Sequence, residues 1–501
     1  MSVRVAVRQI GEGALLVEYP GASEDSANRA AIAAARRLSG RPGILDAVPG
    51  ARTLYLAAEG PIDRPALESE LSAEAGAEKP GRTIRVPVRY GGEHGPDLAE
   101  LSRARGLTPE ELARRHAAAA YRVAFLGFAP GFAYCVGLPE ELATPRLATP
   151  RTRVPAGTLA IGGSYTGIYP SETPGGWRLI GRSPARLFDP TADPPTLFLP
   201  GDAAVFESAG PEVSAVPPGD RPATAYPEGS VPVFRVVSPG LFTSLQGAPR
   251  HGRGSYGVPA GGAMDLPLLS EGNRLVENAP GAPALEITLQ GPELLALSEC
   301  RAAAAGDLEI EVNGSPRPSS RPFTLVPGDR LRLARVTRGV RAYLCIEGGL
   351  AFAVADWQTR RLGKEDTVHR AAPGEARVLL PLLPRGRADG VVRVRPGPQE
   401  DRFTEKSFAA FFDGPWRVSA SSDRRGVRLD GEPLVHAGSA EVAPEGTAPG
   451  AIQVPADGQP IILGPDRPVT GGYAKIGTVI AEDWPLVAQA LPGASLRFRL
   501  A

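Results

Sequence analysis

The chain has 501 residues, too many for one ordinary hydrophobic core, so roughly two to four domains are expected. Its 55 basic and 55 acidic side chains give a formal net charge of zero, which argues against nucleic acid as a partner. The sequence has no apolar window of about 20 residues, so no membrane span is predicted. The N-terminal stretch lacks the apolar core of a signal peptide. Together with three isolated cysteines, Cys135, Cys300 and Cys345, these features favour a cytoplasmic protein.

The first 80 residues alternate between strand and helix patterns. Strands are predicted at residues 3–9, 14–19 and 53–58. Helices follow Ser26 and Asp63, which are expected to be their N-caps, and the first helix ends before Gly40. This order predicts a small sheet with helices on one face, so residues 1–80 are assigned to a small α+β domain.

Residues 81–207 form the second predicted unit. It opens with the strand pattern "TIRVPVRY" and continues with two helices, "DLAELSRARG" and a stronger one after Thr108. Thr108 is expected to cap that helix, with Pro109 in its first position and Glu111 completing a capping box. Beyond Val123, glycine and proline punctuate short apolar runs, a pattern typical of a β-barrel or sandwich.

Residues 208–232 are rich in proline, glycine, alanine and serine without periodicity, and predict a linker. The remaining residues, 233–501, are again mostly short strands. Asn313 and Gly314 carry the signal of a two-residue hairpin turn, and helices are expected only after Asp265 and near the C-terminus. With 60 glycines and 53 prolines spread along the chain, the composition favours a turn-rich, mainly β protein.

Several common cofactor motifs are absent from the sequence. It contains no GxxxxGK[ST] phosphate loop, and its GxGxxG match at residues 252–257 neither follows a clear strand nor opens a helix. The five histidines are scattered without metal-ligand spacing, so no metal site is expected: His94, His116, His251, His369 and His436.

Four Gly/Pro-rich blocks hold polar side chains instead. They span residues 125–142, 150–184, 244–265 and 450–480. Glycine lets backbone amides approach an anion, and Arg, Lys, Thr and Ser can bind carboxylate or phosphate oxygens. Glycine and proline are also needed at the tight corners of a barrel. The pattern alone leaves both interpretations open.

These blocks and a neighbouring helix supply the candidate site residues. His116, Asp265 and Lys475 are the catalytic candidates, with a helix-end role as the alternative for His116 and Asp265. If the stretch "PRTRVP" is extended, Arg151 and Arg153 point the same way and either clamp an anion or lie on a solvated face. The further binding candidates are Thr166 and Asp457.

Two long strings of residues carry a family resemblance. The first half of the chain contains the strings "LGFAPGFAY", "PRTRVPAGT" and "TPGGWRLIGR". In these strings it resembles allophanate hydrolase subunit 1, a family that includes the B subunit of 5-oxoprolinase and a kinase inhibitor. The second half contains the strings "GAIQVPADGQPIIL" and "TGGYAKIGTVI". In these strings it resembles allophanate hydrolase subunit 2, a family that includes the C subunit of 5-oxoprolinase and the antagonist of that inhibitor. Both families are similar to the carboxyltransferase region of urea carboxylase. The resemblance therefore implies a fusion of two subunits in one chain.

The resemblance also implies a fold and an activity. We expect a small N-terminal α+β domain, then a cyclophilin-like β-barrel, then two β-barrel-like domains in residues 233–501. The implied activity is that of an ATP-dependent 5-oxoprolinase, which opens the lactam 5-oxoproline to glutamate with a separate third subunit. Mg²⁺ is a candidate companion of ATP, and a homo-oligomer is left open. The alternatives are the carboxyltransferase component of a biotin-dependent urea or amide carboxylase and a regulator of a sensor histidine kinase.

The sequence departs from the second family at three places: Gly247 replaces an expected Asp, Pro249 replaces an expected Gly, and residues 351–378 are short. These departures put the activity of the second half in question more than its fold.

The first Gly/Pro-rich block is expected to wall a ligand pocket. In a barrel enzyme of this family, Gly127 and Gly131 would bring backbone amides close to a ligand, while Pro130 would stiffen the loop and lower the entropic cost of binding. The alternative is a packed plug that seals the barrel. Because fusion suits two subunits that must always meet, we expect one site between the halves, with Arg151 and Arg153 from one half and Asp265 and Lys475 from the other.

Overall fold

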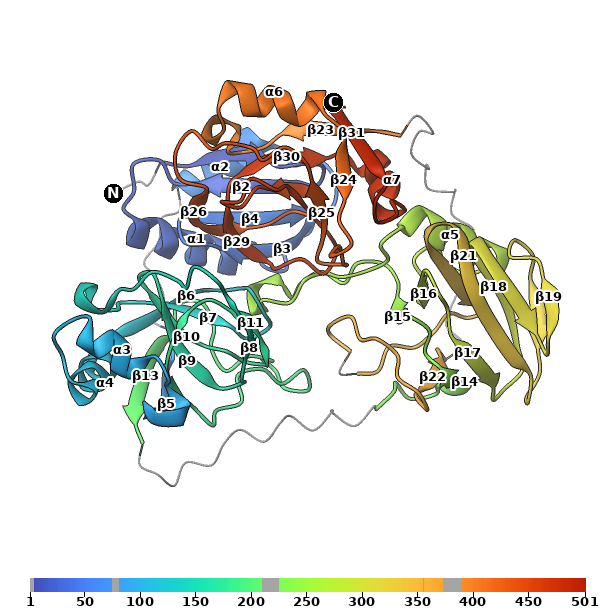
Figure 1. The fold of residues 1–501 in the computed structure, drawn as a ribbon, viewed down its shortest axis with the longest axis horizontal. Helices are drawn as coiled ribbons and strands as arrows, with labels where there is room; N and C mark the ends of the chain where they lie inside the picture. The colour runs from blue at the N-terminus through green and yellow to red at the C-terminus, as the bar shows by residue number, and fades with distance from the viewer. Residues whose placement is uncertain (1–3, 74–80, 210–224, 355, 373–389) are drawn as a thin grey trace.

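The computed structural model describes residues 4–73, 81–209, 225–354, 356–372 and 390–501. Strands account for 39% of the structure and helices for 17%, which confirms the mainly β fold class predicted from the sequence. Figure 1 shows a small N-terminal sheet, a closed barrel, a nine-stranded sheet and a second closed barrel. The domain boundaries given above stay a prediction, and most of the predicted linker lies outside the described residues.

The N-terminal body is a four-stranded antiparallel sheet with strand order β1-β2-β4-β3. Its elements are β1 (Ala6–Gln9), β2 (Ala14–Glu18), α1 (Glu24–Leu38), β3 (Ile44–Pro49), β4 (Thr53–Ala58) and α2 (Arg64–Ala73). The prediction of Ser26 as the N-cap of α1 is wrong. Ser23 caps the helix by accepting a hydrogen bond from Ser26 N at 3.2 Å, because acidic residues that suit a helix N-terminus form the first turn. Asp63 caps α2 as predicted.

The first barrel closes with the strand order β10-β7-β6-β13-β5-β12-β9. Its strands are β5 (Thr83–Tyr90), β6 (Tyr121–Leu126), β7 (Ala133–Val136), β9 (Thr158–Gly162), β10 (Tyr165–Ile168), β12 (Arg178–Arg182) and β13 (Ala203–Ser208). Outside the barrel lie α3 (Leu98–Arg103), α4 (Pro109–Ala118) and a two-stranded sheet of β8 (Arg151–Val154) and β11 (Thr173–Gly175). The predicted capping box of α4 is confirmed, with both of its hydrogen bonds formed between Thr108 and Glu111.

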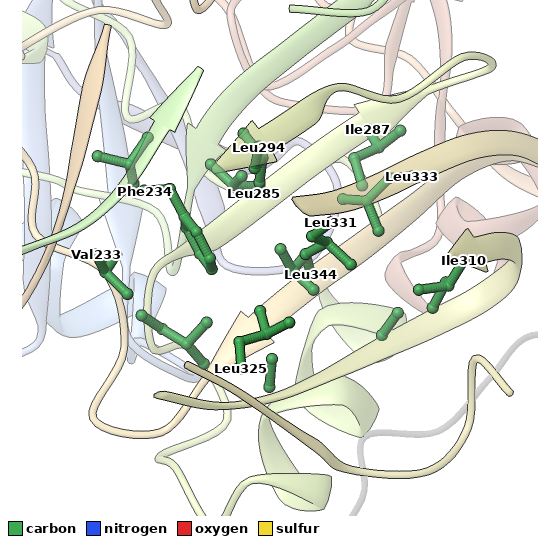
Figure 2. Packing of buried hydrophobic residues seen from close by; sticks show 14 of the residues in the cluster. Val233, Phe234, Leu285, Ile287, Leu294, Ile310, Leu325, Leu331, Leu333 and Leu344 are labelled. Carbon is green, nitrogen blue, oxygen red and sulfur yellow. The ribbon is translucent and has the colours of Figure 1, made fainter. Parts of the chain in front are cut away.

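The nine-stranded sheet begins the second half of the chain. Its elements are β14 (Val231–Ser238), β15 (Phe242–Gln246), α5 (Leu266–Leu275), β16 (Ala284–Thr288), β17 (Glu293–Ala296), β18 (Cys300–Val312), β19 (Ser315–Arg317), β20 (Phe323–Leu325), β21 (Arg330–Ile346) and β22 (Thr367–Arg370). Branched aliphatic side chains and Phe234 fill its core (Figure 2). The predicted hairpin turn is confirmed, because Asn313 and Gly314 have φ values of 51° and 77° between β18 and β19.

The second barrel closes with the strand order β23-β30-β27-β28-β25-β24-β31. Its strands are β23 (Val391–Pro396), β24 (Trp416–Val418), β25 (Gly426–Asp430), β27 (Ala451–Gln453), β28 (Ile461–Leu463), β30 (Lys475–Val479) and β31 (Ser495–Leu500). Outside it lie α6 (Glu405–Asp413), α7 (Trp484–Ala488) and a two-stranded sheet of β26 (Glu441–Gly446) and β29 (Thr470–Tyr473). Helix α6, which the sequence pattern does not predict, is capped by Thr404.

The N-terminal sheet packs against the second barrel, although the two stand at opposite ends of the sequence (Figure 1). Buried apolar side chains of both form one cluster. The backbones also approach closely, since Ala51 N donates to Pro444 O at 2.7 Å and a Cβ on Gly446 would lie 2.1 Å from that of Tyr55. We call this contact between residues 4–209 and residues 390–501 the seam.

Candidate functional site

Two of the candidate residues, His116 and Thr166, lie together inside the first barrel. His116 Nε2 is 2.9 Å from Thr166 Oγ1, and its Nδ1 is 2.9 Å from Tyr90 Oη. Both candidates are fully buried, and burial lowers the pKa of His116 to about 3, so the imidazole is neutral near pH 7. The pair is placed to hold the barrel core together, and a proton transfer role for His116 stays a prediction.

The two candidate arginines on β8 already have carboxylate partners. Arg151 Nη2 donates to Asp97 Oδ1 at 2.7 Å, and Arg153 Nε lies 2.7 Å from Glu172 Oε2. The side chain of Arg153 is 75% exposed, so its ion pair is a surface contact. A ligand would have to compete with these carboxylates for either guanidinium.

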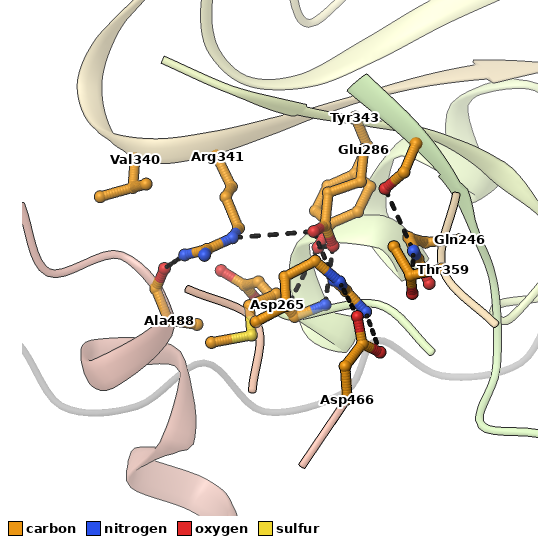
Figure 3. A network of polar contacts seen from close by, with 12 residues as sticks. Gln246, Asp265, Glu286, Val340, Arg341, Tyr343, Thr359, Asp466 and Ala488 are labelled. Carbon is orange, nitrogen blue, oxygen red and sulfur yellow. Dashed lines mark hydrogen bonds and ion pairs between the residues drawn. The ribbon is translucent and has the colours of Figure 1, made fainter. Parts of the chain in front are cut away.

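Asp265 caps helix α5 and belongs to a buried polar network (Figure 3). Its Oδ1 accepts from Leu268 N at 3.0 Å, and its Oδ2 accepts from Gln489 Nε2 at 2.9 Å. Asp457 stands in an exposed turn, where its Oδ1 accepts from Gln459 N at 3.1 Å. The contact of Asp457 is one of local structure, whereas Asp265 also links α5 to Gln489, 224 residues further along the chain.

The centre of the same network is Glu286, which is fully buried on β16. Its Oε1 accepts from Arg424 Nη1 at 2.5 Å, and its Oε2 accepts from Tyr343 Oη and from Met264 N, both at 2.7 Å. Burial alone would raise the pKa of Glu286, but the charges of Arg424 and Arg341, together with the hydrogen bonds from Met264 N and Tyr343, lower it overall. The network joins the nine-stranded sheet to the second barrel.

The glycine-rich loop of residues 125–142 lies against the second half of the chain. Gly131 N donates to Tyr256 O at 3.0 Å. A Cβ on Gly127 would lie only 1.7 Å from Thr470 Oγ1, so glycine is required there for the close approach. The loop therefore brings Gly127 to the seam and Gly131 to the segment around Tyr256.

Lys475, the third catalytic candidate, is buried near the seam with a carboxylate beside it. Its Nζ lies 2.6 Å from Glu445 Oε1, and the two side chains are 2% and 7% exposed. Gln399 Nε2 donates to the same carboxylate oxygen at 2.8 Å, while Gln399 Oε1 accepts from Lys475 N. The Lys475–Glu445 contact has the distance of an ion pair but not the geometry of a hydrogen bond. Glu445 therefore balances the charge of the ammonium, while no atom of the described residues meets the geometry of a hydrogen bond to Lys475 Nζ.

Other unpaired polar atoms lie on the same seam as this lysine. Across the described ranges, eight buried side-chain nitrogens and oxygens lack a hydrogen-bond partner. Gln453, one of the residues that carry them, is the strand partner of Lys475, while Thr470 Oγ1 lies beside Gly127 and Thr53 Oγ1 beside Gly50 on the same seam. Buried polar atoms are nearly always paired in folded proteins, so such a group points to a bound water or ligand. We call Thr53, Gln453, Thr470 and Lys475 together with Glu445 the seam cluster.

The parts of the seam cluster come from both halves. Gln453 and Lys475 are partners in the β27–β30 ladder, and Glu445 and Thr470 belong to the β26–β29 sheet that covers it. Thr53 is the first residue of β4, and its Oγ1 lies near Gly50, whose Cβ would touch Glu445. Hydroxyl, amide and ammonium donors in a dry site can hold a carbonyl oxygen or stabilise negative charge on it.

Sequence reasoning finds only Lys475 of this cluster, as a rare lysine in a Gly/Thr-rich block. Glu445, Gln453, Thr470 and Thr53 carry no motif signal, and only strand pairing brings them together.

The GxGxxG segment at residues 252–257 lies against the N-terminal sheet. Gly252 N and Gly254 N donate to Asp46 Oδ1 at 3.0 and 2.9 Å, and His251 Nδ1 is 3.1 Å from Asp46 Oδ2. The amides that could cradle a phosphate therefore hold a carboxylate of the protein itself. This segment does not fit the phosphates of ATP.

An open depression of about 690 Å³ lies elsewhere, beside β14 and β22. Tyr226 and His369 stack within it, with ring centroids 3.7 Å apart. Its Arg360 is paired with Asp366 at 2.5 Å. Because these polar groups already contact each other, the depression is the weaker candidate. No group of three or more metal-binding side chains occurs in the part of the chain that the structure describes, and no helix there is long and apolar enough to cross a membrane.

The fold and its two barrels are those of a known family. The family model described as carboxyltransferase domain, subdomain C and D, matches residues 5–198, and the model for subdomain A and B matches residues 256–500. The chain belongs to this carboxyltransferase-domain family and carries both subdomain pairs, which confirms the resemblance to allophanate hydrolase subunits 1 and 2.

Relatives match the two halves separately. The B subunit of 5-oxoprolinase from Escherichia coli O157:H7 is 40% identical over 204 residues, covering 39% of this chain and 93% of the relative. The C subunit of 5-oxoprolinase from Escherichia coli is 32% identical over 286 residues, covering 53% of this chain and 90% of the relative. The crystal structure of TTHA0988 matches both halves at once, with 34% identity, a TM-score of 0.84 and coverage of 99% of this chain and 100% of that chain.

Proposed function

We propose that this chain is a natural fusion of the B and C subunits of an ATP-dependent 5-oxoprolinase. With a separate third subunit it would open the lactam ring of 5-oxoproline to give glutamate. The observation that carries the proposal is the near-complete match of two different 5-oxoprolinase subunits to consecutive parts of one chain. The seam supports it, because a polar cluster built from both halves is what an obligate pair of subunits would share.

We assign ATP to the assembled system rather than to a site in this chain. The GxGxxG segment is filled by Asp46, and the single ammonium of the seam cluster has Glu445 beside it, which disfavours a triphosphate. The role proposed for this chain is to bind the lactam, to orient its amide group and to exclude water until the ring is opened.

The test is glutamate formation by the purified chain with its third subunit, supplied with ATP and 5-oxoproline. Glutamate is expected only when both proteins and both small molecules are present. A complete mixture that yields no glutamate, from a chain shown to bind the third subunit, would overturn the proposal.

A second candidate is the carboxyltransferase component of a biotin-dependent urea or amide carboxylase. The description of both matching family models as carboxyltransferase subdomains favours it. Its test is transfer of the carboxyl group from a carboxylated biotin carrier to urea. A kinase-regulating role is less favoured, because an inhibitor and its antagonist packed along one seam would occlude each other at an effective concentration of about millimolar or more.

A further inference from the structure

The two closed barrels have one topology. When the strands are matched in chain order, β5 with β23 and so on to β13 with β31, the two barrels have the same strand order. In each barrel the first and last strands pair in parallel. The extra two-stranded sheets also correspond, because β8 with β11 becomes β26 with β29. The chain therefore contains two copies of one architecture.

The correspondence extends to single residues. In the first barrel, Leu159 pairs with Gly181 and then, across a register shift, Ala160 pairs with Leu179. In the second barrel, Ile452 pairs with Gly477 and then, across a register shift at the same step, Gln453 pairs with Lys475. The pair Ala160–Leu179 is thus the counterpart of Gln453–Lys475.

Both pairs stand on the outer face of their barrels. Leu159 belongs to the core inside the first barrel, and Ile452 to the core inside the second. Side chains alternate between the two faces of a strand, so the next residue on each strand points outward. Ala160 and Gln453 accordingly lie outside these cores, at matching places on the two surfaces.

The two surfaces differ in chemistry. Ala160 and Leu179 are packed in a cluster with Phe132, Tyr134 and Trp177, whose rings contact one another with centroids 5.0 to 5.5 Å apart. That copy is filled by the aromatic side chains of the protein itself.

The copy in the second barrel carries an amide and an ammonium instead of two apolar side chains. Gln453 is 7% exposed and Lys475 is 1% exposed, and Gln453 Nε2 and Lys475 Nζ have no hydrogen-bond partner within the described ranges. Leaving buried donors unpaired is unfavourable, and the first barrel holds an apolar pair at the same place. The polar pair therefore serves a ligand rather than the fold.

We propose that this surface of the second barrel binds the lactam group of the substrate, an inference that rests on the proposed function. Gln453 and Lys475 donate hydrogen bonds to the ring carbonyl oxygen, and Glu445 accepts from the ring N–H. Since Lys475 and Glu445 balance each other in charge, the ligand group that suits them is polar and uncharged. A lactam amide has that character, and the carboxylate of 5-oxoproline lies outside the seam cluster.

The experiment measures binding by calorimetry to the chain assembled with its third subunit, without ATP. The probes are 5-oxoproline and 2-pyrrolidinone, which is the same lactam without the carboxylate. We expect both to bind the wild type, and Gln453→Leu and Lys475→Met each to weaken binding about tenfold or more. Lys406→Met, which changes an exposed lysine of α6, is the matched control and should leave both affinities unchanged.

Several outcomes separate this inference from the proposed function. Gln453→Leu leaves the Lys475–Glu445 pair in place, so it keeps the test decisive if Lys475→Met fails to fold. A Gln453→Leu affinity within twofold of the wild type overturns the inference, as does a wild type that binds neither lactam. If Gln453→Leu weakens lactam binding but the wild type forms no glutamate, the inference is upheld and the proposed function is overturned. If Gln453→Leu forms glutamate at the wild-type rate, the proposed function is upheld and the inference is overturned.

Discussion

The substitution Glu286→Gln tests whether the buried network of Figure 3 holds the nine-stranded sheet to the second barrel. The carboxylate accepts hydrogen bonds from Arg424, Tyr343 and Met264 N, and both Glu286 and Arg424 are almost completely buried. A glutamine keeps the shape but turns one acceptor into an N–H₂ donor. That donor must then face another donor, and Arg424 loses the negative charge of Glu286.

Arg424 keeps its ion pair with Asp466 at 2.8 Å in this variant, so its charge stays compensated, and the expected cost is that of leaving buried hydrogen-bond donors without an acceptor, about 1 to 3 kcal/mol. We expect Glu286→Gln to lower the free energy of unfolding by about this amount at pH 7. The pKa of Glu286 is lowered in the folded state. The stability that its charge contributes is therefore present above the unfolded pKa of about 4.3 and is lost as the pH falls through the folded pKa. The difference between wild type and variant should shrink in the same range.

Urea unfolding followed by tryptophan fluorescence measures this change, since Trp484 Nε1 donates to Met264 O beside the network. The matched control is Glu311→Gln, which breaks the surface ion pair with Arg332, whose two side chains are 37% and 60% exposed. Such a pair contributes at most about 1 kcal/mol. If Glu286→Gln costs no more than Glu311→Gln, the reasoning about the buried network is refuted.

Three further substitutions test the seam, the barrel core and the contact of the GxGxxG segment with Asp46. Gly127→Ala places a Cβ 1.7 Å from Thr470 Oγ1 and should cost about 1 to 3 kcal/mol, measured as a lower melting temperature. The control Gly438→Ala has open space around the new Cβ and should leave the melting temperature unchanged. Equal melting temperatures for the two variants would contradict the prediction. His116→Gln removes a histidine whose folded pKa of about 3 lies below the unfolded value of about 6.5. Below pH 6.5 the wild type should therefore lose about 1.4 kcal/mol of stability per pH unit more than the variant, and parallel pH profiles would disprove the assignment. Asp46→Ala removes the oxygen that accepts from two backbone N–H groups and should destabilise the protein by about 1 to 3 kcal/mol in urea unfolding, and no loss would show that this contact is dispensable.

Local signals in the sequence predict local structure well. The capping box of Thr108 and Glu111 and the turn at Asn313 and Gly314 involve residues a few positions apart, whose geometry is fixed by the backbone between them. Ser26 shows the limit of such signals, because Ser23 is an equally good cap and the acidic residues between them decide the boundary.

The candidate site could be predicted only in part, because its residues are brought together by strand pairing over long separations. Lys475 stands out as one of four lysines, but Glu445 and Gln453 become its neighbours only through the β27–β30 ladder and the sheet that covers it. The composition of its loop places Gly127 in the wall of a ligand pocket, and the structure shows that its missing side chain makes room for Thr470.

The duplication of the barrel explains why motif strings alone do not locate the site. Both barrels have Gly/Pro-rich turns, because corresponding turns connect corresponding strands. The motif strings therefore indicate the barrel fold in each half and do not distinguish the half that holds the site. What differs is a pair of side chains on one face, Ala160 with Leu179 in one copy and Gln453 with Lys475 in the other. The N-terminal sheet of the first half packs against the second barrel, and it brings Thr53 next to the polar pair. In one chain this contact forms without the entropy loss of bringing two subunits together, so fusion favours a site that needs both halves.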